Sequence, residues 1–246
     1  MGEGVTLIAD PRVVEIPIED SGEPLIDLRD IASVAGFHLD ARKRDADDLW
    51  LHVRAGIADR LRRAQADAPA GVSLLVVEGY RPVALQAFYF ERYVGELRAE
   101  HPNWDRRRLR DVASRYVAPP DIVPPHSTGA AVDVTLVDAS GGELDLGTRV
   151  NASPEESGGA CFTAASGLTP EAAGNRKLLR LLMESAGFVN YGTEWWHWSY
   201  GDRYWAFTTG AAAAIYGTAT PGEPASTIFS KNTRSKPSSR RRPTST

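Results

Sequence analysis

Two short segments of the chain carry residues that could bind a metal ion and use it. The first holds His126 and Asp133, spaced as H-x6-D, and the second holds Glu194 and His197, spaced as E-x-x-H. A catalytic zinc ion takes three nitrogen or oxygen ligands from the protein and keeps one position open. Each residue type alone is common in cores and on surfaces, but the combined order is far more specific. We therefore expect His126, Asp133 and His197 to bind zinc, with Glu194 available as acid/base.

Both segments need a bent backbone to bring these side chains together. In a regular strand Glu194 and His197 would point to opposite faces, so a turn or bulge is expected at Trp195–Trp196. The prolines before His126 and Gly129 after it also imply a bend, which turns the imidazole inward.

The elements around these segments predict an α+β fold, a single domain over residues 1–217 with a central, mostly antiparallel sheet flanked by helices. Residues 139–168 are rich in Gly and Ser and are typical of a long functional loop. Extended chain is predicted over residues 11–31, 72–80, 130–137 and 188–200. Helices are predicted over residues 46–67, after Pro82, over 104–116 and over 169–188.

Composition limits the classes of protein that remain. A chain of 246 residues with 42% hydrophobic and 24% charged residues is typical of a soluble globular protein. The single cysteine, Cys161, excludes an internal disulfide, and no secretory or membrane-spanning segment is evident, so a cytoplasmic location is expected. Residues 218–246 form a basic, Ser/Pro/Arg-rich segment that we expect to be a disordered tail. The acidic remainder argues against nucleic-acid partners. Because no apolar run approaches the length of a membrane span, we expect no membrane partner either.

The motifs HSTGAAVD and EWWH resemble those of the D-alanyl-D-alanine dipeptidases of the vancomycin-resistance type, which belong to a wider group of zinc D,D-peptidases. The stretches IDLR, VVEGYRP, LDLGT and NRKLLRLLMESAGF agree in order and spacing, so the resemblance covers roughly residues 14–205. It implies one zinc ion per chain on the three ligands, Glu194 as the catalytic acid/base, and Arg81 as a cation that stabilises the transition state. The alternative for Arg81 is a structural ion pair at the end of a strand.

Two positions depart from that family where its members bind the substrate amine. Asn151 stands where the family has an aspartate, and Asp30 stands where a tyrosine is usual. An amide keeps an acceptor oxygen but loses the charge, so ammonium binding should weaken. Either Asp30 compensates, or the substrate is an N-blocked dipeptide, a longer peptide or another small amide. Ser127 and Trp196, inside the two motifs, are further candidates for substrate binding.

The sequence thus predicts a zinc-dependent hydrolase that cleaves D-Ala-D-Ala or a related dipeptide, with a small peptide as its partner. One alternative is a D,D-carboxypeptidase or amidase that acts on an N-blocked substrate. An alternative of another class is a non-catalytic binding protein on the same fold. A homo-oligomer is compatible with all three.

Overall fold

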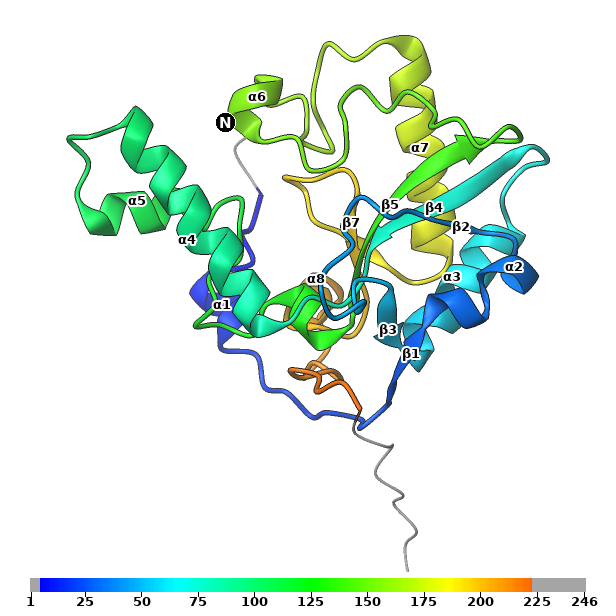
Figure 1. Cartoon of the computed structure of the whole chain (residues 1–246), viewed down its shortest axis with the longest axis horizontal. Coiled ribbons are helices and arrows are strands. Elements are labelled where there is room, and N and C mark those ends of the chain that lie inside the picture. Colours follow the sequence, from blue (N-terminus) through cyan, green and yellow to red (C-terminus); the bar gives the residue numbers. More distant parts are fainter. Residues whose placement is uncertain (1–4, 223–246) are drawn as a thin grey trace, which may run out of the picture.

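A five-stranded sheet lies at the centre of the computed structural model, which describes residues 5–222 (Figure 1). Its strand order is β2-β4-β5-β7-β6, and a separate pair joins β1 to β3. Only β2 and β4 are parallel among the neighbouring strands described, so the predicted α+β class with a mostly antiparallel sheet is confirmed. The strands are β1 Leu25–Asp27, β2 His38–Leu39, β3 His52–Arg54, β4 Val72–Glu78, β5 Ala131–Asp138, β6 Val189–Asn190 and β7 His197–Ser199.

Helices surround this sheet unequally. The helices α3 and α7 contact each other and cover one face, whereas α4 and α5 project away from the sheet as an arm (Figure 1). The α-helices are α1 Pro11–Val14, α2 Ala32–Ala35, α3 Ala55–Ala66, α4 Val83–Glu100, α5 Arg106–Ala113, α6 Pro154–Ser157, α7 Pro170–Ser185 and α8 Arg203–Thr209. The 3-10 helices are η1 Leu28–Asp30 and η2 Pro125–Thr128.

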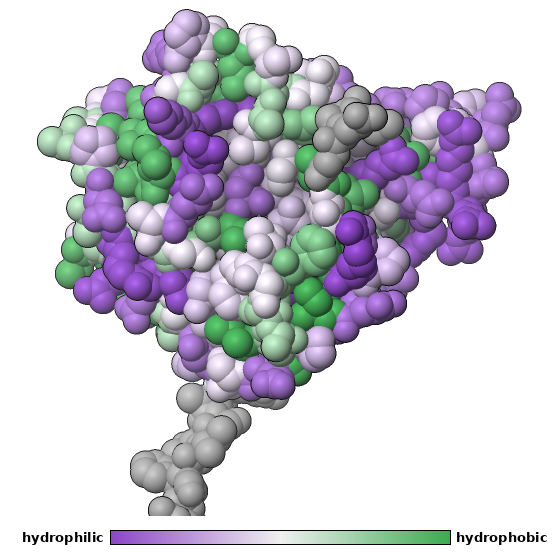
Figure 2. All heavy atoms as spheres, turned by 180° about the vertical axis from the view of Figure 1, so that it is seen from behind, coloured by the Kyte–Doolittle hydropathy of each residue, from purple (hydrophilic) through white to green (hydrophobic). Residues whose placement is uncertain are grey.

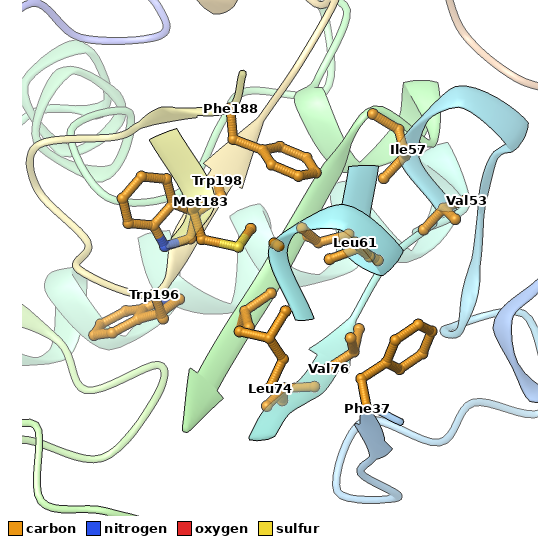
Figure 3. Close-up of a cluster of buried hydrophobic side chains, with 14 of the residues drawn as sticks. Phe37, Val53, Ile57, Leu61, Leu74, Val76, Met183, Phe188, Trp196 and Trp198 are labelled. Carbon is orange, nitrogen blue, oxygen red and sulfur yellow. The ribbon is translucent and has the colours of Figure 1, made fainter. Parts of the chain in front are cut away.

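The main core fills the space between the sheet and the pair α3 and α7. Leu61 of α3 and Met183 of α7 meet Leu74 and Val76 of β4 there, all of them buried (Figure 3). Because side chains alternate along a strand, the residues of β5 that face this core leave Asp133 on the opposite face. The candidate site residues Asp133 and His197, which are register partners, lie on that opposite face.

The arm has a small core of its own, in which Phe90 and Leu97 of α4 pack against Leu109 of α5. Its outer surface is mostly hydrophilic (Figure 2). No helix within residues 5–222 is long and apolar enough to cross a membrane. The cytoplasmic location stays a prediction of the sequence.

Two of the predicted elements were wrong. Residues 11–31 are not continuously extended: Asp10 caps a helical turn that starts at Pro11, and only Leu25–Asp27 forms a strand. The segment 46–67 is not one helix, because His52–Arg54 pairs with β1 before α3 starts at Ala55. Pairing between segments overrode the local pattern in this second case. The helix α8 was not predicted at all.

The segment 218–246 is described only up to residue 222. Within this part Ala219 is buried, its N–H donates to the carbonyl of Ser127, and its own carbonyl accepts from the hydroxyl of Tyr80. The chain therefore still packs on the domain at residue 219. The predicted disorder of the remaining tail lies outside the described residues.

Gly129 is predicted to be needed for the bend after His126. It has a φ of +69°, and a Cβ there would overlap Cδ2 of Leu25. Gly129→Ala should lower the free energy of unfolding by roughly 1–2 kcal/mol for the left-handed backbone and by about 1–3 kcal/mol more for the overlap. Urea unfolding in EDTA measures this loss without a contribution from metal binding.

Gly141→Ala is the matched control, because Gly141 has a φ of +85° and open space around its Cα. It should show only the backbone part of the loss. Equal destabilisation by the two substitutions would contradict the role assigned to the contact between Gly129 and Leu25.

Candidate active site

Three side chains form a row across the face of the sheet that α3 and α7 leave free. Asp133 of β5 is the register partner of Glu78 on β4 and of His197 on β7. Directly opposite residues of neighbouring strands point to the same face, with Cβ atoms about 4.5–5.5 Å apart. The register of β4 shifts between Val76 and Glu78, which places the carboxylate of Glu78 in this row. All three members of the row are buried.

His126 reaches the row from outside the sheet, on the short helix η2. A carbonyl oxygen can only accept, so the 2.7 Å contact between Nδ1 of His126 and the oxygen of Gly79 requires the proton on Nδ1. The other ring nitrogen, Nε2, is then left with a free lone pair that faces Asp133 and His197. A hydrogen bond of this kind fixes a histidine in the state and orientation that a metal requires.

The donor atoms of His126, Asp133 and His197 form a nearly equilateral triangle. Nε2 of His126 lies 3.1 Å from Nδ1 of His197, and Oδ1 of Asp133 lies 3.3 Å and 3.2 Å from these two nitrogens. Tetrahedral zinc with bonds of about 2.0–2.1 Å separates its ligand atoms by about 3.3–3.4 Å. The histidine and aspartate donors present thus fit zinc in both chemistry and spacing.

The acid/base candidate Glu194 lies beside this triangle, with Oε2 3.9 Å from Nδ1 of His197. A turn at Trp195–Trp196, closed by the N–H of His197 on the carbonyl of Glu194, brings both side chains to one side, so the predicted turn is confirmed. The side chain of Asn190 donates to the carbonyls of Glu194 and His197 and holds the turn. Burial raises the pKa of Glu194 to about 7, within the range of a general base that works near neutral pH.

Arg81 follows β4 and is buried against Glu78. Its Nε and Nη2 each donate to one carboxylate oxygen of Glu78 at 2.7 Å, and Nη1 donates to Oε1 of Gln86 at 2.7 Å. Burial alone would lower the pKa of the guanidinium, but the charge of Glu78 holds it above its ordinary value. Arg81 is therefore both an ion pair at the end of the strand and a fixed cation in the wall of the site.

A cavity of about 510 Å³ opens over the row, with Arg81 and the three donor residues among its lining groups. The helix α4 forms one wall with Tyr89 and Tyr93, and the loop at 149–156 contributes another part of the lining. Most of these wall residues were not predicted from the sequence. The spacing of Gln86, Tyr89 and Tyr93 at three and four residues is the signal that could have found them. Lys43 and Arg92 also line the cavity and were not predicted from the sequence.

The model of the D-ala-D-ala dipeptidase family, Peptidase_M15, matches residues 44–211, which include Arg81, Glu194 and the three donor residues. The chain belongs to this family.

Curated relatives agree with this membership. The D-alanyl-D-alanine dipeptidase of Synechocystis is 32% identical over 219 residues, which cover 78% of this chain and 87% of the relative. That of Enterococcus faecalis is 35% identical and covers 61% of this chain and 76% of the relative. Among solved structures, VanYB in complex with D-Alanine-D-Alanine is 18% identical, with a TM-score of 0.39, and covers 68% of this chain and 82% of that chain.

The four substrate-binding candidates lie in different places. Asn151 lines the cavity with a φ of +62°, and its Nδ2 is buried without a hydrogen-bond partner among the described residues. Ser127 is buried behind the site, where its hydroxyl donates to the carbonyl of Arg81. Trp196 points into the main core (Figure 3). Asp30 is exposed at the end of η1 and is not among the residues that line the cavity.

The structure therefore brings Asn151 to the site but does not bring Asp30, Ser127 or Trp196 into the cavity. The physical reasons differ. The turn that aims Glu194 and His197 at the site sends the indole of Trp196 to the other face. Asp30 belongs to a 3-10 turn capped by the side chain of Asp27, and this turn leaves its carboxylate in solvent.

We expect the purified protein to hold about one zinc ion per chain, because a catalytic site needs a single metal on three ligands. His126→Ala should lose most of this zinc, since it removes one ligand from a buried triangle. Elemental analysis after gel filtration measures the ratio. His38→Ala, at an exposed histidine of β2, is the matched control and should keep its zinc. Equal zinc contents in the two variants would contradict the assignment of His126.

Proposed function

We propose that this protein is a zinc-dependent dipeptidase that hydrolyses D-Ala-D-Ala or a closely related dipeptide. The observation that carries the proposal is the buried triangle of His126, Asp133 and His197 with Glu194 at its edge, in a member of the D-ala-D-ala dipeptidase family. The curated relatives are D-alanyl-D-alanine dipeptidases by name. The complete set of ligands and acid/base groups argues against a non-catalytic binding protein.

His126, Asp133 and His197 would hold the zinc ion. When bound, zinc supplies Lewis-acid chemistry: it lowers the pKa of a water molecule and polarises the scissile carbonyl. Glu194 takes the proton from the attacking water and returns it to the nitrogen of the leaving amine. Its carboxylate is suited to both steps because burial has raised its pKa to about 7.

Arg81 is placed to stabilise the negative charge that develops on the carbonyl oxygen. Its guanidinium is fixed by Glu78 and Gln86 before substrate arrives, so little reorganisation is needed during the reaction. A preorganised donor of this kind typically contributes about 100- to 1000-fold in rate. The ion pair with Glu78 therefore serves the chemistry as well as the fold.

Glu194→Gln should bind zinc normally and lose at least about 1000-fold in kcat, because the amide cannot accept the proton of the water. Metal analysis together with the rate of release of D-alanine tests both parts. Glu184→Gln, at an exposed position of α7, is the matched control and should keep full activity. Near-normal turnover by Glu194→Gln would rule out this residue as the acid/base.

Asn151 favours a second candidate function, hydrolysis of N-blocked or longer substrates. Its unpartnered Nδ2 is a donor, and a donor suits the carbonyl oxygen of an acyl group better than it suits an ammonium group. Comparison of D-Ala-D-Ala with its N-acetyl form separates the two functions. Efficient cleavage of the free dipeptide alone would exclude the second candidate.

Asn151→Asp should shift the preference toward the free dipeptide by about tenfold in the ratio of kcat/KM values, because a carboxylate binds ammonium more strongly than an amide does. Both residues tolerate the positive φ at this position, so the backbone should be unaffected. Asn103→Asp, at an exposed position before α5, controls for the added charge. An unchanged ratio would mean that Asn151 does not contact the amino end of the substrate.

A further inference from the structure

A second cation, Lys43, lines the cavity beside Arg81. Its Nζ lies 3.4 Å from Oε2 of Glu78 and 5.3 Å from the centre of the ring of Tyr89. The side chain of Lys43 is 21% exposed, whereas that of Glu78 is 2% exposed. Lys43 precedes the region matched by the family model, which begins at residue 44.

At this end of the cavity two cations, Lys43 and Arg81, share the single carboxylate of Glu78. Glu78 already receives two hydrogen bonds from Arg81, one on each oxygen. Arg81 and Arg92 also lie near the ring of Tyr89, at 5.0 Å and 5.2 Å from its centre to each Cζ. The contact of Arg92 with Glu96 is 3.5 Å long and largely exposed, so it neutralises little of this charge.

An anion is therefore favoured at the wall formed by Lys43, Arg81 and Tyr89. Glu78 stays hydrogen-bonded to Arg81 if the ammonium group of Lys43 turns toward a ligand, so no buried carboxylate is left unpaired. The partly exposed lysine is the member of this group that can move, because Arg81 is buried and held by three hydrogen bonds.

The position of Lys43 beside the candidate catalytic residues indicates which anion it would bind. Glu78, which Lys43 contacts, is the register partner of Asp133, and Lys43 lines the same cavity as the three donor residues. Lys43 lines the same cavity as Glu194, the residue assigned to deliver the proton to the leaving amine. In a dipeptide the leaving amine and the free carboxylate belong to the same residue, and only the Cα separates them.

We propose that Lys43 binds the free carboxylate of the leaving residue and so selects substrates that end directly after the scissile bond. The proposal rests on the function proposed above. It makes Lys43 a specificity-determining residue, distinct from Arg81, which faces the developing oxyanion. A peptide whose C-terminus is amidated or extended lacks the charge that Lys43 recognises.

The test compares kcat/KM for D-Ala-D-Ala and for its C-terminal amide in the zinc-loaded enzyme. Lys43→Met should lower the value for D-Ala-D-Ala by about tenfold to a hundredfold, the range expected for a lost hydrogen bond between charged groups. The value for the amide should change less than about threefold, and Lys43→Arg should recover most of the loss with D-Ala-D-Ala. Lys177→Met, at an exposed position of α7, is the matched control and should behave like the wild type with both substrates.

A purely structural role gives a different result. If Lys43 acted only by holding Glu78 and Arg81, Lys43→Met would lower kcat/KM for both substrates by the same factor, and the proposal would be overturned. The proposal would also be overturned if Lys43→Met left kcat/KM unchanged for both D-Ala-D-Ala and its amide.

Binding measurements separate this proposal from the proposed function. D-Ala-D-Ala is titrated calorimetrically into zinc-loaded Glu194→Gln, with and without Lys43→Met. A Kd about tenfold weaker in the double variant, with no such change for the amide, supports the assignment of Lys43 even if wild-type turnover is absent and the dipeptidase function fails. Equal Kd values, or no binding of D-Ala-D-Ala at all, overturn it.

Discussion

The register of Asp133 between Glu78 and His197 is the constraint on which the rest of the site depends. It places two buried carboxylates side by side, an arrangement that is costly unless each one has a cation. Arg81 and Lys43 supply the cations for Glu78, and the zinc ion with its two histidines is suited to Asp133. A slip of one residue in β5 would turn Asp133 into the main core and separate it from the histidines.

The loop that carries Asn151 depends on a second buried cation, Arg176 of α7. Its guanidinium donates to the carbonyls of Leu146, Ala160 and Phe162, so a single side chain ties three points of a long segment to one helix. Burial lowers the pKa of Arg176 to about 10, which still leaves it charged at neutral pH. In the sequence, Arg176 is recognisable only as one residue of the family-like stretch NRKLLRLLMESAGF, with no role of its own. The structure shows that it holds a wall of the cavity.

Local signals account for the parts of the fold that were predicted correctly. The apolar run before Glu78 forms β4, Pro82 precedes α4, and Thr169 caps α7 through the N–H of Ala172. These signals act within one turn or one strand, so they can be read from neighbouring residues. The strand at His52–Arg54 could not be read in this way. Its residues also fit a helical stripe, and only pairing with β1 decides between the two.

The sequence by itself determined the chemistry of the site, because the residue types of the two motifs restrict the metal and the acid/base, and the bend at Trp195–Trp196 follows from their spacing. Only the tertiary structure decided which other side chains line the cavity. Lys43, Tyr89 and Asn151 come from three segments far apart in the chain and share one cavity, whereas Trp196, next to the candidate metal ligand His197 in sequence, faces the core. Proximity in the chain fixes the direction of a side chain only within one element, whereas strand register and loop packing set the contacts between elements.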